Sequence, residues 1–113
     1  MPPTLDEHFA GRLPAVKLTY ERLLQAVRGF GDVTEDPKKT SIHLNRTSAF
    51  AGVATRNDGI LLTIKAPVDV RSERILRHER ASANRWHLVL RLRAPRDVDA
   101  ELLSWLKVAY DMS

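Results

Sequence analysis

Trp86-His-Leu-Val-Leu-Arg-Leu-Arg93 is the part of the sequence in which the hydrophobic pattern is clearest. Every second residue is apolar from Trp86 onward, and the residues between them are His87, Val89, Arg91 and Arg93. Successive side chains of a β-strand point to opposite faces of its sheet, so this period of two predicts a strand with one face in a core and one cationic face. Pro95 should end the strand.

Two segments that precede this strand have the same period. Residues 41–45 alternate polar with apolar side chains, and residues 60–65 do the same except that Leu61 is apolar. Residues 49–55 between them are small and apolar. The pair Asp58-Gly59 is typical of tight hairpin turns, so we expect these three segments to form an antiparallel meander. Residues 66–84 carry many charges and little periodicity. There we expect a connecting segment with at most one helical turn, around Ser72 to Leu76.

Helices are predicted near both ends of the chain. Thr4 and Glu7 have capping-box spacing, so a short helix should begin there and stop at Gly11. Pro14 fits the first turn of a longer helix that ends near Gly29, and Asp97 is a candidate N-cap for a closing helix.

The sequence therefore predicts the α+β class, with one antiparallel sheet of about four strands and helices packed on one face. N-terminal and C-terminal helices should flank the sheet. A length of 113 residues is common for one domain, so residues 1–113 are expected to form a single domain. The other face of the sheet should display His43, Asn45, Thr63, Lys65, His87, Arg91 and Arg93.

The sequence contains no cysteine, which excludes disulfide scaffolds, thiolate metal sites and cysteine nucleophiles. It also has no apolar run of about 18 residues, the length that a membrane-spanning helix needs. The first residues lack the apolar core of a signal peptide. We therefore expect a cytoplasmic protein with no membrane association.

Positive charge is concentrated in the middle of the chain. Residues 37–96 contain thirteen lysine or arginine residues against four acidic ones, a net charge of +9, whereas the segments before and after carry −2 and −3. A field of one sign attracts anions such as phosphates or acidic protein surfaces. The same charges could equally form a solvated face.

Four stretches of the chain resemble a bacterial protein family. They are Pro37-Lys-Lys-Thr-Ser-Ile-His43, Phe50-Ala-Gly-Val53, Asn84-Arg-Trp-His87 and Asp99-Ala-Glu-Leu-Leu-Ser-Trp-Leu106. In these stretches, and in their order along nearly the whole chain, the sequence resembles the domain of unknown function family 5655. The resemblance implies a small α+β domain without an established activity. It therefore transfers no catalytic residue to this chain.

Hydroxyl and cationic side chains gather around the first predicted strand and along the polar sides of the later ones. Such donors suit a phosphate or another anion, although the chain has no glycine-rich phosphate loop. The candidate anion-binding residues are Lys38, Lys39, Thr40, His43, Arg46, Lys65, His87, Arg91 and Arg93.

The sequence predicts no metal site and no cofactor. His43 and His87 could meet if their strands pair, but a third ligand is lacking and the neighbouring side chains are cationic. Asp58 followed by Thr63-Ile-Lys65 has the layout of a metal-dependent nuclease, except that Thr63 stands where a carboxylate is required.

Since no catalytic constellation is recognisable, the leading hypothesis is a non-catalytic binding or interaction module. Its cationic sheet face would meet an anionic partner: nucleic acid, a phosphate ligand or an acidic protein. The alternative is a small-ligand or enzymatic domain that uses His43, Arg46 and His87 in a pocket. A third hypothesis is a homodimer joined through the exposed sheet face.

Overall fold

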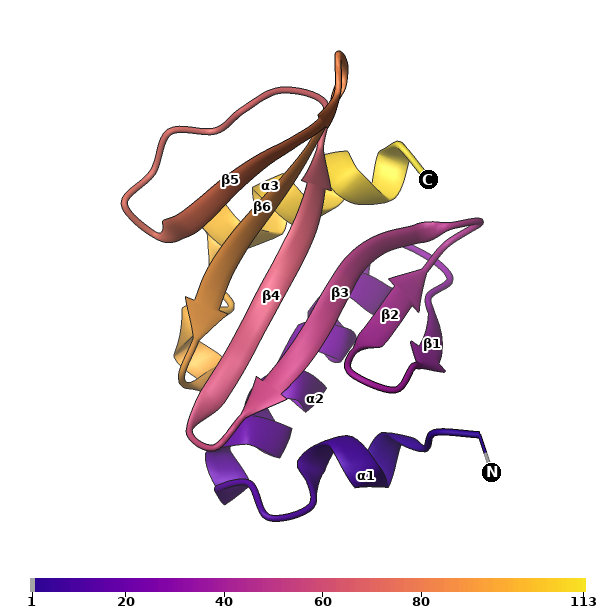
Figure 1. Ribbon diagram of the computed structural model, residues 1–113, viewed down its shortest axis with the longest axis vertical. Coiled ribbons are helices and arrows are strands. Elements are labelled where there is room, and N and C mark those ends of the chain that lie inside the picture. Colours follow the sequence, from indigo (N-terminus) through magenta and orange to yellow (C-terminus); the bar gives the residue numbers. More distant parts are fainter. Residues whose placement is uncertain (1) are drawn as a thin grey trace.

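The computed structural model describes residues 2–113. It contains one antiparallel sheet of six strands in the order β1-β2-β3-β4-β6-β5, together with helices at both ends of the chain (Figure 1). The strands are β1 Thr34–Pro37, β2 Ile42–Asn45, β3 Ala49–Arg56, β4 Gly59–Ala66, β5 Ile75–Ser82 and β6 Arg85–Leu92. The helices are α1 Leu5–Phe9, α2 Pro14–Arg28 and α3 Ala100–Asp111, with a 3₁₀ turn, Pro95–Asp97, before α3.

The α+β class and the meander of β2, β3 and β4 are confirmed, but the prediction of about four strands was wrong. The segment expected to be a connector contains β5, which is the edge strand beyond β6. Only Ile75 of β5 is buried, and its other residues are exposed. Because both faces of this edge strand meet solvent, its sequence carries no alternation. Strand β1 was missed because it is a four-residue edge strand that ends at Pro37.

One face of the sheet is covered by α2 and α3, which lie behind the strands in Figure 1. Alternate residues of the central strands point into this interface, and the side chains of Leu62 on β4 and Leu90 on β6 have no exposed surface. Helix α2 contributes Leu23 and α3 contributes Leu106 to the same cluster, both fully buried. The core therefore lies between the sheet and these helices. No helix within residues 2–113 is long and apolar enough to cross a bilayer.

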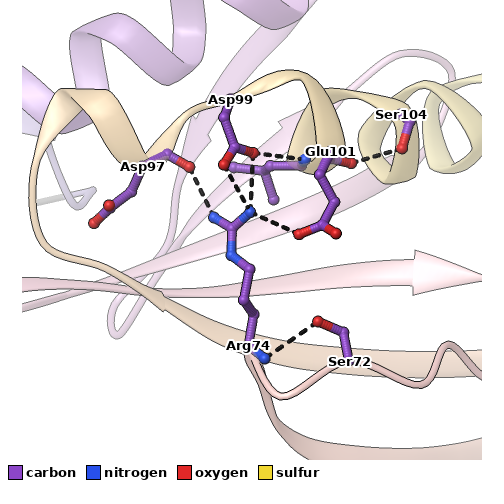
Figure 2. A network of polar contacts seen from close by, with 7 residues as sticks. Ser72, Arg74, Asp97, Asp99, Glu101 and Ser104 are labelled. Carbon is purple, nitrogen blue, oxygen red and sulfur yellow. Dashed lines mark hydrogen bonds and ion pairs between the residues drawn. The ribbon is translucent and has the colours of Figure 1, made fainter.

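Arg74 fixes the start of α3 against the segment before β5 (Figure 2). One guanidinium nitrogen donates to Asp99 Oδ1 at 2.9 Å and to Glu101 Oε1 at 3.1 Å, and the other donates to the carbonyl oxygen of Asp97 at 2.8 Å. Asp99 rather than Asp97 is the N-cap of α3, because its carboxylate accepts the backbone N–H of Leu102 at 3.0 Å.

Asp97, which the sequence suggested as this cap, serves the preceding turn instead. Its carboxylate accepts the backbone N–H groups of Arg93 at 2.7 Å and Ala94 at 3.2 Å. Asp97 is the last residue of the 3₁₀ turn, which the sequence did not predict, and Val98 separates it from Asp99.

Candidate functional site

The face of the sheet that the helices leave open contains a hollow of about 350 Å³. This volume lies at the small end of the range of roughly 300–1,000 Å³ that ligand pockets have. The lining comes from five strands and the residue before β2: Ser41, His43, Ala49, Ala51, Gly52, Ala54, Arg56, Leu61, Thr63, Lys65, Arg77, His87 and Val89.

A row of directly paired residues crosses the middle of the hollow. Pairing runs from His43 on β2 to Gly52 on β3, then to Thr63 on β4, Val89 on β6 and Arg77 on β5. Since paired residues of neighbouring strands share a face of the sheet, these five side chains point to the same side. The middle three residues form a floor that is apolar except for the Thr63 hydroxyl. The His43 imidazole lies at one end of this floor and the Arg77 guanidinium at the other.

Small side chains make the floor deep at β3. Gly52 has no side chain, and a Cβ atom built on it would meet only the His43 ring, at 4.0 Å. Ala54 lies two residues further along the strand and pairs with Leu61. The hollow is therefore a depression over β3 and β4 whose floor is largely aliphatic.

Cationic side chains stand around this floor. Lys65 on β4 is paired with His87 on β6, Arg77 lies on the edge strand and Arg56 is the last residue of β3. Within residues 2–113, the side chains of Lys65, Arg77 and His87 form no hydrogen bond and no ion pair. Arg56 differs from them because its guanidinium donates to the carbonyl oxygen of Thr55 at 3.0 Å.

Two carboxylates lie near the ends of the hollow. Asp36 on β1 is paired with His43, and its carboxylate accepts Lys38 Nζ at 2.9 Å. That hydrogen bond lowers the pKa of the Asp36 carboxyl below its usual value. Glu79 on β5 is paired with His87 and is exposed. Asp36 is thus engaged by a lysine outside the hollow, whereas Glu79 is the acidic neighbour nearest in register to Lys65 and His87.

Three of the residues proposed from the sequence line the hollow: His43, Lys65 and His87. Lys38, Lys39 and Thr40 instead lie in the turn between β1 and β2. Arg91 and Arg93 line a different depression, of mixed charge, together with Glu73, Arg74, Asp97 and Asp99. Together with Arg46, which lies at α3, the predicted anion-binding residues are therefore distributed over four places.

Arg46 lies on the helix side of the sheet and does not line the hollow. Its guanidinium stands 4.6 Å from the centroid of the Tyr110 ring and donates to the carbonyl oxygen of Tyr110, at the end of α3, at 3.2 Å. His43 and His87 are separated by β3 and β4, which at the usual strand spacing means about 14 Å. The structure does not bring His43, Arg46 and His87 together. Within residues 2–113, no three His, Cys, Asp or Glu side chains group as metal ligands.

Comparison with known proteins gives a family and no activity. A family model described as "Domain of unknown function (DUF5655)" matches residues 5–113. The chain belongs to this family. No curated protein matches, and no solved structure matches. The side chains of this DUF5655 chain are therefore the basis for any inference about its ligand.

The residues that sequence reasoning missed are those that shape the floor. Gly52 and Ala54 fall in a segment whose small apolar residues indicated only a strand, and Arg77 falls in the supposed connector. A signal for the floor was present, because Gly52 and Ala54 have the opposite phase to Val53 and Thr55, which face the core. Two small residues on the outward phase of a central strand indicate a recess rather than a packed layer.

Proposed function

We propose that this DUF5655 chain is a non-catalytic binding module whose open sheet face contacts an anionic partner. The observation that carries the proposal is that Lys65 and Arg77 border a hollow with an aliphatic floor and have no acidic partner within residues 2–113. A cation that stabilises a fold usually has partners of its own, as Arg74 has in Asp99 and Glu101.

The chemistry of the hollow favours contact with charged groups over stacking on bases. Its lining includes no phenylalanine, tyrosine or tryptophan. The aromatic rings of Tyr20, Phe50 and Tyr110 lie in the core on the covered side. Proteins that bind single-stranded nucleic acids through a sheet commonly stack bases on exposed aromatic rings. An acidic polypeptide or a phosphate-bearing ligand therefore suits this face better than the bases of a nucleic acid.

The two other hypotheses receive less support. An enzymatic pocket built from His43, Arg46 and His87 lacks its central member, because Arg46 is engaged with Tyr110. A dimer formed by apposing two open faces would bring together two surfaces that each carry Arg56, Lys65 and Arg77, and like charges in one interface repel each other.

The proposal is tested by titrating the protein with polyglutamate and with single-stranded DNA and RNA at low and at physiological ionic strength. We expect binding of polyglutamate that weakens with salt, and a loss of at least about fivefold in the double variant Lys65→Gln/Arg77→Gln. The matched control is Lys17→Gln/Arg22→Gln, which removes two exposed cations from α2 and should bind like the wild type. Equal losses in the two double variants would refute a specific role of the open face.

A further inference from the structure

Gly52 has no conformational reason to be glycine. Within residues 2–113, positive backbone φ angles occur at Gly11 and Gly31, and Gly52 is not among them. It lies inside β3, where glycine weakens a strand because it adds backbone entropy to the unfolded chain and packs no side chain. An alanine at this position would also not collide with the protein, since its Cβ would meet only the His43 ring, at 4.0 Å.

The absence of a side chain at Gly52 does have a geometric effect, because it deepens the hollow. Gly52 lies between His43 and Thr63 in the row of paired residues that crosses the floor. A valine or leucine there would project from the floor into the space that Leu61 and Val89 border. Glycine inside a strand is often found where another molecule approaches the backbone closely.

From this geometry we infer that the hollow above Gly52 is a binding site for a small organic anion, a carboxylate or phosphate with a compact apolar body. The inference rests on the proposed function and specifies the ligand. The apolar body lies on the floor formed by Gly52, Leu61 and Val89, and the charged group lies at the rim beside Lys65 and Arg77. Thr63 offers a hydroxyl in the middle of the floor.

Both parts of such a ligand are needed for the fit. An anion without an apolar body would interact only with Arg77, which is exposed, and Lys65, which is partly buried, at a face open to solvent, where water and salt screen the interaction. A neutral apolar molecule would leave Lys65 and Arg77 without a counter-charge. A hollow of about 350 Å³ suits one small molecule. Each methylene group that leaves water on binding contributes roughly a fourfold gain in affinity, so the length of the apolar body should be visible in the dissociation constant.

The test uses the full chain and compares four probes by NMR titration: acetate, hexanoate, hexyl phosphate and the neutral hexanamide. We expect hexanoate or hexyl phosphate to bind at least about fivefold more tightly than acetate and than hexanamide, with amide shifts centred on Gly52, Thr63 and Val89. The comparison of the two hexyl anions identifies the preferred charged group. A ratio below fivefold for both of them overturns the inference.

Three variants separate the floor from the rim: two graded substitutions of Gly52 alter the floor, and one substitution of Lys65 alters the rim. Gly52→Ala and Gly52→Val should weaken the better hexyl anion progressively, and Lys65→Gln should weaken it while leaving hexanamide unchanged. Gly52→Val should leave the binding of polyglutamate unchanged, because the cations at the rim remain. Unaltered hexyl-anion binding in Gly52→Val would overturn this inference and leave the proposed function intact. If the wild type bound the hexyl anion but did not bind polyglutamate, the contact with an acidic polypeptide would be refuted and the small-molecule site would remain.

Discussion

The two faces of the sheet are built from the same strands, but the side chains of one face pack against helices and those of the other line an open hollow. On the covered face Leu62 and Leu90 have no exposed surface and pack against α2 and α3. On the open face Thr63, next to Leu62, is partly buried, whereas Val89, next to Leu90, keeps 8% of its surface exposed, and both line a hollow. Packing determines the residue types on the covered face. On the open face no helix covers the side chains, so we expect packing to restrict residue types less there, and Gly52, which we expect to weaken its strand, is the residue that the proposed ligand would explain.

Truncation in the covered face should have the largest effect on stability. Leu90→Ala removes a fully buried side chain and should lower the free energy of unfolding by about 2–5 kcal/mol, through lost burial and the cavity that remains. Leu61→Ala, on the open face and only partly buried, is the matched control and should cost less than about half as much. Urea denaturation of both variants measures the difference. Equal losses of stability would contradict the claim that the covered face contributes more to stability than the open face.

The ion pairs at the start of α3 should give an effect of intermediate size. Arg74→Gln removes hydrogen bonds to Asp97, Asp99 and Glu101 and should cost about 1 kcal/mol at neutral pH, because the Arg74 side chain is 27% exposed while its two carboxylate partners are about half exposed. Its control is Lys107→Gln, which removes an exposed i,i+4 pair with Asp111 and should cost no more than about 0.5 kcal/mol. A cost for Arg74→Gln no greater than that for Lys107→Gln would show that the cluster is not stabilising.

The same cluster predicts a pH dependence. The hydrogen bond from the backbone N–H of Leu102, together with Arg74, holds the pKa of Asp99 below its usual value. A carboxyl with a lowered folded pKa stabilises the protein fully above its unfolded pKa of about 3.9, and this contribution is lost as the pH falls through the folded value. The cost of Arg74→Gln should therefore shrink between pH 5 and pH 2. A cost that is constant over this range would exclude the charge of Asp99 as its source.

Filling the hollow should have a smaller effect, and in the stabilising direction. Gly52→Val introduces a β-branched residue into a central strand at a position where the added Cβ would meet no atom closer than 4.0 Å, and it should raise the free energy of unfolding by about 0.5–1 kcal/mol. Thermal unfolding in the absence of any ligand measures this directly. A destabilised Gly52→Val would mean that glycine serves the fold, which would remove the main argument for a ligand site.

Neutralising the rim should have the smallest effect on stability. Lys65→Gln/Arg77→Gln should stay within about 0.5 kcal/mol of the wild type, because neither side chain has a partner within residues 2–113. Urea denaturation at low and high salt is the measurement. A larger loss would indicate that the two cations hold the edge of the sheet.

The strands predicted correctly from the sequence are those with one buried face. Residues 42–45 and 86–92 alternate because a helix layer covers one side of them. Strand β5 could not be recognised in this way, since only Ile75 of the strand enters the core. The start of α3 was misjudged by two residues because Asp97 and Asp99 are both good N-caps and the chain uses both.

Residues of the candidate site could be predicted only in strands whose alternating side-chain pattern is visible in the sequence. His43, Lys65 and His87 were expected on the open face and line the hollow. Arg46 has the same phase as Ile42 and Leu44, which should have assigned it to the covered side, where it contacts Tyr110. Arg77 became part of the rim only through the pairing of β5 with β6, a long-range arrangement that periodicity does not encode.

The order of the strands has a consequence for how the hollow assembles during folding. Strands β3 and β4 form one hairpin and β5 and β6 form another, and the two hairpins join where β4 pairs with β6, for example Ile60 with Leu92. Gly52 belongs to the first hairpin and Val89 to the second. Local hairpins form early, whereas distant pairing waits for loop closure. The hollow therefore forms only when the two hairpins pair through β4 and β6. A ligand bound there would slow the separation of the two hairpins, and it would protect the backbone amides of both from hydrogen exchange together.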